Sequence, residues 1–181
     1  MEIRKLTVEF DGNRVINELD LDITESVVAL MGPSGRGKTA LLRAIAGLVE
    51  YSGEIIGVNH PVMLFQEDRL FPWLNVRQNA ALFTKDASSV EYWLERLGLE
   101  AVKDSSITTL SGGMQRRVSL AAMLCSDGDV FLLDEPTRGL DEQNADIVMQ
   151  CVLQRAQGKT VIFSTHSLAL AQKYAQRIID L

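Results

Sequence analysis

The stretch GPSGRGKT, residues 32–39, follows the apolar run VVALM at 27–31 and precedes the helical pattern ALLRAIAG at 40–47. Glycines at the end of a strand let consecutive backbone N–H groups point into one hollow, and the next helix adds the positive end of its dipole. With the spacing G-x-x-x-x-G-K-[ST], Lys38 can reach the β- and γ-phosphates of a nucleotide, and Thr39 can bind the Mg²⁺ that bridges them. The stretch therefore predicts a nucleotide-binding loop rather than a flexible turn before an ordinary helix.

Two carboxylates follow a second apolar run, VFLL at 130–133. Asp134 and Glu135 carry a desolvation cost there unless a cation or partner compensates it. Mg²⁺ would compensate Asp134, and Glu135, on the other side of the strand end, could polarise a water aimed at a γ-phosphate. The alternative is that the pair only caps the next turn. A lone histidine is usually structural, but His166 ends the strand predicted at 160–165 and so reaches the carboxyl edge of the sheet, where open α/β sheets bind ligands.

A third motif, LSGGMQRRV at 110–118, opens another helical pattern. A serine and two glycines at a helix start make a second anion site, because free backbone N–H groups and the positive end of the helix dipole meet there as they do at the first site. The alternative is an N-cap at Ser111 followed by a solvated basic face. One chain cannot easily use both anion sites on one phosphate.

The elements around these motifs predict an α/β fold. Residues 5–10 and 19–23 alternate polar and apolar side chains, which indicates half-exposed antiparallel strands, whereas the apolar runs at 130–133 and 160–163 are typical of a parallel sheet covered on both faces. A helix is predicted at 146–156. We expect a P-loop NTPase core with a parallel sheet, an N-terminal antiparallel β subdomain and a helical subdomain inserted at about 75–111, all within a single domain, 1–181.

The chain has 181 residues, 46% of them hydrophobic, and a net charge of −6. This acidic balance argues against nucleic acid as a partner, and no window approaches the roughly 18 to 20 apolar residues of a spanning helix. We expect any work at a membrane to go through a partner protein. Cys125 and Cys151 lack metal-ligand spacing and lie in apolar helical patterns, which favours buried free thiols over a disulfide.

Taken together, these motifs resemble the nucleotide-binding subunit of ATP-binding cassette (ABC) transporters. The motifs follow one another in the order typical of that family and span nearly the whole chain. They are the loop at 32–39, Gln66 after an apolar strand, LSGGMQRRV at 110–118, FLLDEPT at 131–137, GLD at 139–141 and His166. The LSGG box is the specific part, because kinases and GTPases share the phosphate loop. No guanine-reading N-K-x-D motif is visible, which argues for adenine.

The resemblance implies a head-to-tail homodimer in which two copies hold each ATP. The catalytic residues it implies are Glu135 as general base, His166, Gln66 and Lys38. The metal ligands it implies, for Mg²⁺, are Thr39, Gln66 and Asp134. The nucleotide contacts it implies are Phe10, stacked on adenine, Gly32, Pro33, Ser34, Gly35, Arg36, Gly37, Lys38, Thr39 and Ala40, with Ser111, Gly112 and Gly113 from the partner copy and Asp141 at the contact between subunits.

The resemblance also implies a membrane partner. In this family the region after Gln66 receives a cytoplasmic helix of the permease, and aromatic residues there would form an apolar groove. The alternative, weighed equally, is that Phe71 and Trp73 pack the subdomain core. The sequence FQEDRLFPWLNVRQN at 65–79 is similar to the corresponding segment of importer ATPases for nitrate, sulfonates, taurine and thiamine. The likeness implies a cytoplasmic protein, peripheral at the cytoplasmic face of the inner or plasma membrane, with a solute-binding protein as an indirect partner.

Three departures from the family pattern stand out. Ala40 takes the place of a second hydroxyl, Met114 replaces the usual glutamine, and Ser167 begins a segment without the family's acidic residue. The chain ends at Leu181 after one more expected strand, so we interpret it as a minimal cassette with intact chemistry. Two other functions stay open: a soluble mechanical ABC ATPase without a permease, and a P-loop kinase, which the LSGG box disfavours.

Overall fold

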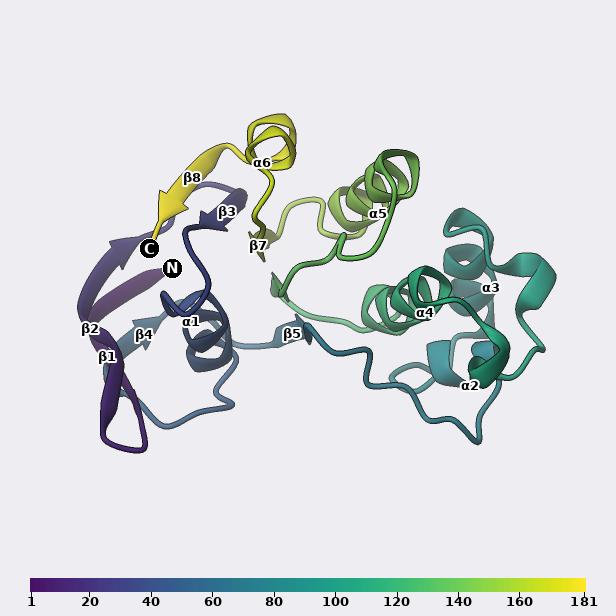
Figure 1. Ribbon diagram of the computed structural model, residues 1–181, viewed down its shortest axis with the longest axis horizontal. Helices are drawn as coiled ribbons and strands as arrows, with labels where there is room; N and C mark the ends of the chain where they lie inside the picture. The colour runs from purple at the N-terminus through teal and green to yellow at the C-terminus, as the bar shows by residue number, and fades with distance from the viewer. The chain divides into compact units, whose positions relative to one another are not determined.

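The computed structural model describes all 181 residues (Figure 1). It contains a five-stranded sheet in the order β5-β6-β7-β3-β8. Neighbouring strands β6 and β7, β7 and β3, and β3 and β8 pair in parallel. The five strands are β3 (Val27–Met31), β5 (Pro61–Leu64), β6 (Val130–Leu133), β7 (Thr160–Ser164) and β8 (Arg177–Asp180). All four residues of β6 are buried, as expected for a strand covered on both faces. The prediction of a parallel core sheet is confirmed.

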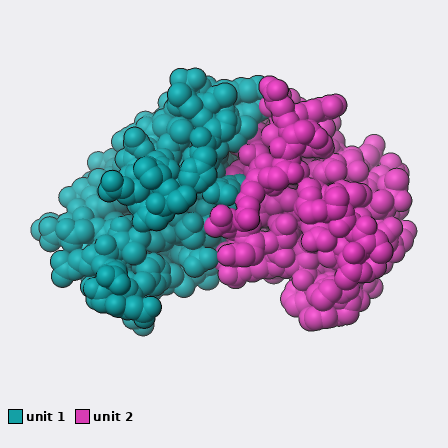
Figure 2. Space-filling view, in the orientation of Figure 1, with its two compact units in different colours: residues 1–63, 128–135, 158–181 teal, residues 64–127, 136–157 magenta.

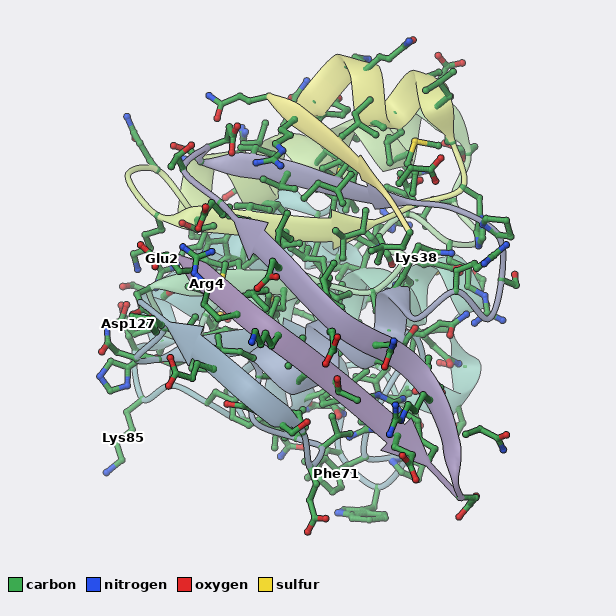
Figure 3. All side chains as sticks on the ribbon, turned by 90° about the vertical axis from the view of Figure 1, so that its left-hand side faces the viewer. Glu2, Arg4, Lys38, Phe71, Lys85 and Asp127 are labelled. Atoms are coloured by element: carbon green, nitrogen blue, oxygen red, sulfur yellow. The ribbon has the colours of Figure 1, made fainter.

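A second sheet is antiparallel, with the order β2-β1-β4. It consists of β1 (Glu2–Phe10), β2 (Asn13–Asp22) and β4 (Ser52–Ile56). Figure 3 labels Glu2 and Arg4 on β1, where Arg4 forms ion pairs with Glu2 and with Asp22 of β2. The registers of β1 shift at bulges, and opposite one of them an ideal Cβ on Gly53 would lie 2.4 Å from the Arg4 carbonyl oxygen. Only a glycine fits that close backbone approach.

The chain divides into two compact units, which Figure 2 colours separately. Unit 1 comprises Met1–Met63, Gly128–Glu135 and Gly158–Leu181. It holds the antiparallel sheet, nearly all of the five-stranded sheet, and helices α1 (Lys38–Ile45) and α6 (Leu168–Tyr174). Its core is formed by buried aliphatic residues from strands and helix alike, among them Ile3, Leu30, Leu41, Leu132 and Ile162.

Unit 2 comprises Leu64–Asp127 and Pro136–Gln157 and is helical. Its helices are α2 (Val76–Ala80), α3 (Ala87–Arg96), α4 (Gly112–Leu124) and α5 (Glu142–Arg155), with short 3₁₀ turns at Glu100–Val102 and Ile107–Thr109. The prediction that the last of these helices begins at residue 146 is wrong. It begins one turn earlier, because the Asp141 carboxylate accepts a hydrogen bond from the backbone N–H of Asn144 and caps the helix there.

Both cysteines are free and buried, as predicted. Burial raises the pKa of the Cys125 thiol and of the Cys151 thiol, since the thiolate loses its solvation there. No helix in the structure combines the length and the apolar character that crossing a membrane requires.

Candidate functional site

The loop at 32–39 joins β3 to α1 and bends through three glycines with positive φ, Gly32, Gly35 and Gly37. At Gly37, φ is 94°, and an ideal Cβ would lie 3.1 Å from Ile16 Cγ1. A side chain at this position would be both strained and crowded. No side chain caps α1 at Gly37, so the first N–H groups of the helix remain available to an anion. The loop has the backbone shape that the sequence predicts for a phosphate site.

Lys38 is the first residue of α1 and is only 7% exposed (Figure 3). Its ammonium group donates hydrogen bonds to the carbonyl oxygens of Gly32, at 2.7 Å, and Pro33, at 2.9 Å. The cation is thus folded back over its own loop and held by backbone acceptors. This arrangement places one positive charge above the glycine-rich turn, where a phosphate of a nucleotide binds in loops of this kind.

Asp134, directly after β6, is 2% exposed and has both carboxylate oxygens satisfied by hydroxyl groups. Thr39 Oγ1 donates to Asp134 Oδ2 at 2.7 Å, and Ser164 Oγ donates to Asp134 Oδ1 at 2.6 Å. Such hydrogen bonds offset the cost of burying a carboxylate. The structure thereby brings together the two residues, Thr39 and Asp134, that the sequence assigns to a metal.

Ser164 is the residue that the sequence reasoning missed. It is fully buried at the end of β7, and besides donating to Asp134 it accepts a hydrogen bond of 2.9 Å from the backbone N–H of Glu135. One hydroxyl therefore fixes both neighbouring acidic residues. The signal was present in the sequence: a lone polar residue closes the otherwise apolar run 161–164, at the strand end where ligands bind.

Glu135 and His166 form a pair at the carboxyl ends of β6 and β7. Glu135 Oε1 lies 3.0 Å from His166 Nε2, and the two side chains are 20% and 49% exposed. Glu135 has a φ of 49°, in the left-handed region that non-glycine residues rarely adopt. Such strain is often found at functional sites, and here it accompanies a carboxylate that is hydrogen-bonded but still reachable by solvent.

The motif at 110–118 lies in unit 2 and starts α4. Ser111 caps the helix, its Oγ accepting a 3.3 Å hydrogen bond from the backbone N–H of Met114. A Cβ on Gly112 would meet no atom within 4 Å, so this helix start is open. The solvated basic face, one of the alternatives above, is absent, since Arg116 is 2% exposed and Arg117 donates to the Leu97 carbonyl oxygen at 2.8 Å.

The remaining predicted residues are Phe10, Gln66 and Asp141. Phe10 is 40% exposed at the end of β1 in unit 1, and Gln66 follows β5 in unit 2. Asp141, also in unit 2, caps α5; the Asn144 backbone N–H, with help from the Asn144 side chain, lowers the pKa of this carboxyl. Unit 1 thus contains the phosphate loop with Asp134, Glu135 and His166, whereas unit 2 contains Gln66, the helix start at Ser111 and Asp141.

Comparison with known proteins agrees with this geometry. The family model described as ABC transporter matches residues 16–138. The taurine import ATP-binding protein of Jannaschia sp. is 35% identical over 204 residues, a match that covers 99% of this chain and 76% of the relative. The aliphatic sulfonates import ATP-binding protein of Pseudomonas savastanoi pv. phaseolicola is 37% identical over 188 residues, covering 99% and 79%.

Among solved structures, a dimeric ATP-binding cassette in a post-hydrolysis state, bound to ADP and Pi, superposes with a TM-score of 0.87. Its sequence is 26% identical, and the match covers 99% of this chain and 93% of that one. The chain therefore belongs to the ABC transporter family and is an ATP-binding, ATP-hydrolysing cassette.

Proposed function

We propose that this ATPase powers solute import through a membrane permease, and that two copies of the chain close head to tail around ATP to do so. The observation that carries the proposal is the hydrogen-bonded chain in unit 1 from Thr39 through Asp134 and Ser164 to Glu135 and His166. It joins the helix of the phosphate loop to a pair of groups suited to activating water.

Thr39 and Asp134 fit a magnesium ion. They offer a hydroxyl and a carboxylate, which are oxygen donors of the kind that Mg²⁺ prefers. No group of three or more His, Cys, Asp or Glu side chains that could hold a metal occurs in the structure. An incomplete set suits this ion, which usually takes one or two protein ligands, several waters and the oxygens of the nucleotide phosphates. Bound there, Mg²⁺ would neutralise developing phosphate charge. Gln66 is a further ligand that the family resemblance alone implies.

For hydrolysis, we assign Glu135 as the general base and His166 as the group that orients it and binds the γ-phosphate. The 3.0 Å contact between them supports this assignment, because a base held by a neighbouring group stays aimed at its water. Lys38 would bind the β- and γ-phosphates from its position over the loop, and Ser164 would keep Asp134 and Glu135 in place. Phe10, exposed at the end of β1, would stack on the adenine ring.

Two copies are needed because each chain carries two anion sites. One is the loop at 32–39 in unit 1, and the other is the open helix start at Ser111, Gly112 and Gly113 in unit 2. We propose that the second site of one copy binds the γ-phosphate held by the first site of the other, with Asp141 near the contact. The dimeric state of the superposable cassette with ADP and Pi supports this arrangement.

Exposed aromatic residues in unit 2 support a permease as partner. Trp73 is 75% exposed and Phe71 40%, with their ring centroids 5.2 Å apart. Such exposure favours a docking surface over core packing. Because relatives are import ATP-binding proteins for taurine and aliphatic sulfonates, we propose a small sulfonate as the solute, a solute-binding protein as an indirect partner, and a location at the cytoplasmic face of the membrane.

The proposal is tested by co-purifying the chain with its permease from detergent-solubilised membranes and measuring sulfonate-stimulated ATP hydrolysis. Trp73→Ala is expected to abolish co-purification. Tyr51→Ala is the control, because Tyr51 is another exposed aromatic residue, 40% exposed, but lies in unit 1. If the wild-type chain hydrolyses ATP yet never co-purifies with a permease, it is a soluble mechanical ATPase and the import proposal is wrong. Transfer of phosphate to an acceptor other than water would instead indicate a kinase.

A further inference from the structure

Arg116 is a buried arginine in the middle of the motif that opens α4, and it is only 2% exposed. Its Nη1 donates to the Phe65 carbonyl oxygen at 2.6 Å and to Asp68 Oδ1 at 3.0 Å, and it lies 3.5 Å from the Gln66 carbonyl oxygen. Its Nε lies 3.4 Å from the Pro136 carbonyl oxygen. A buried guanidinium is costly unless its donors are satisfied, so these acceptors account for its burial.

The acceptors belong to two chain segments that contain proposed site residues. The first segment, residues 65–68, includes Gln66, and the Arg69 guanidinium lies 3.5 Å from the centroid of the Phe65 ring in the same segment. The second begins at Pro136, the residue directly after Glu135. Arg116 itself lies five residues after Ser111, on the helix whose start is the second anion site.

We propose that Arg116 is a positioning residue for ATP hydrolysis, linking the helix that starts at Ser111 to the backbone at Gln66 and to the residue after Glu135. The inference rests on the function proposed above. When a phosphate engages the start of α4, a rigid guanidinium transmits the resulting shift of that helix to both segments. Lysine cannot replace it, since an ammonium group lacks the planar fork that serves several acceptors at once.

Arg155 provides a matched control for the alternative in which Arg116 only stabilises unit 2. It too lies on a helix of that unit and donates to two backbone carbonyl oxygens, of Leu124 at 2.9 Å and Ser126 at 2.6 Å, and to Asp127 Oδ1 at 3.3 Å. None of these three acceptors belongs to a proposed site residue. If Arg116 had a purely structural role, Arg116→Lys and Arg155→Lys would have the same effect on kcat and on hydrogen exchange.

The experiment compares Arg116→Lys with Arg155→Lys in the full chain, measuring kcat and KM for ATP, the thermal unfolding midpoint, and hydrogen exchange of residues 65–70. We expect Arg116→Lys to lower kcat about tenfold, with KM changed less than about twofold, and to speed exchange of residues 65–70. Arg155→Lys should keep kcat within about twofold of wild type at a similar loss of thermal stability. Equal kcat values and equal exchange in the two variants would overturn the inference.

Asp68→Ala supplies a second variant should Arg116→Lys fail to fold, because the Asp68 side chain is 25% exposed and its loss leaves the carbonyl acceptors in place. We expect kcat to fall about threefold at unchanged KM, and a kcat indistinguishable from wild type would overturn the inference. Failure of the underlying function looks different, since a wild-type chain that does not hydrolyse ATP would refute the proposed function before any variant is compared.

Discussion

Glu135 Oε1 lies 3.0 Å from His166 Nε2, so the strained acidic residue after β6 and the histidine after β7 meet at the same edge of the sheet. The two side chains come from parts of the chain about thirty residues apart, and parallel pairing of β6 with β7 brings them together. The contact gives a carboxylate with a fixed orientation and remaining access to solvent, which are the properties that a general base for water requires.

His166→Ala should therefore lower kcat for ATP hydrolysis by about a hundredfold or more, because Glu135 loses the group that orients it. The affinity for ATP, measured by equilibrium binding, should change far less. His60→Ala is the control, since the chain has only two histidines and His60 is exposed and follows β4 at a distance from the phosphate loop in the sequence. Equal activity of the two variants would remove His166 from the mechanism.

Ser164→Ala tests the hydroxyl that serves both acidic residues. Its loss leaves the buried Asp134 carboxylate one donor short and the Glu135 N–H without its acceptor, so we expect about 1–3 kcal/mol of destabilisation, and a reduced kcat. Chemical denaturation and steady-state kinetics measure the two effects. Ser119→Ala is the matched control, because the Ser119 hydroxyl is buried without a hydrogen-bond partner and its removal should be neutral or stabilising. A neutral Ser164→Ala would contradict the account of the site.

Asp141 should make stability depend on pH. Its carboxyl has a lowered pKa in the folded chain, mainly through the Asn144 backbone N–H, so the charged form stabilises the fold. This contribution is fully present above the unfolded pKa, near 3.8, and is lost as the pH falls through the lower folded value. Asp141→Asn keeps a cap for α5 but removes the titration. Urea unfolding at pH 7 and pH 3 should show a smaller loss of stability on acidification in the variant, and an identical loss would exclude this role.

Much of the fold follows from local sequence. The spacing at 32–39 between an apolar strand and a helix is decisive, because glycines, lysine and a helix start together have few other uses. Strand β4 was missed, since its five residues contain a glycine with φ of 98° and are mostly exposed, and only pairing with β1 makes them a strand. The start of α5 was misplaced because the hydrophobic pattern begins later than the cap at Asp141.

The site was harder to predict wherever a role depends on tertiary contacts. Lys38, Thr39, Asp134, Glu135 and His166 were identified from motifs, and the structure shows the contacts of these side chains. The burial of Arg116 could not be foreseen, because an arginine in a basic run usually faces solvent, and its acceptors, backbone carbonyl groups and the Asp68 carboxylate, are far away in the sequence. The role of Ser164 could not be predicted for the same reason, because its hydroxyl reaches Asp134 and Glu135 only when β6 and β7 lie side by side.

Gly112→Asp tests whether the start of α4 acts on a second copy. A Cβ at this position meets no atom within 4 Å in its own chain, so folding should be preserved. A carboxylate at a helix start that binds phosphate would repel the nucleotide held by the partner. We expect ATP binding to the single chain to persist while hydrolysis falls to the background rate. Unchanged hydrolysis would mean that this helix start binds no phosphate.

The central claim is that two copies of the chain hold each ATP between them. Sedimentation of Glu135→Gln with ATP and Mg²⁺ tests it most directly, because blocked hydrolysis should trap the closed state. The account predicts a species of twice the 20.0 kDa chain mass that requires ATP and disappears when Gly112→Asp is added. A protein that binds ATP and remains at the single-chain mass at every concentration would contradict it.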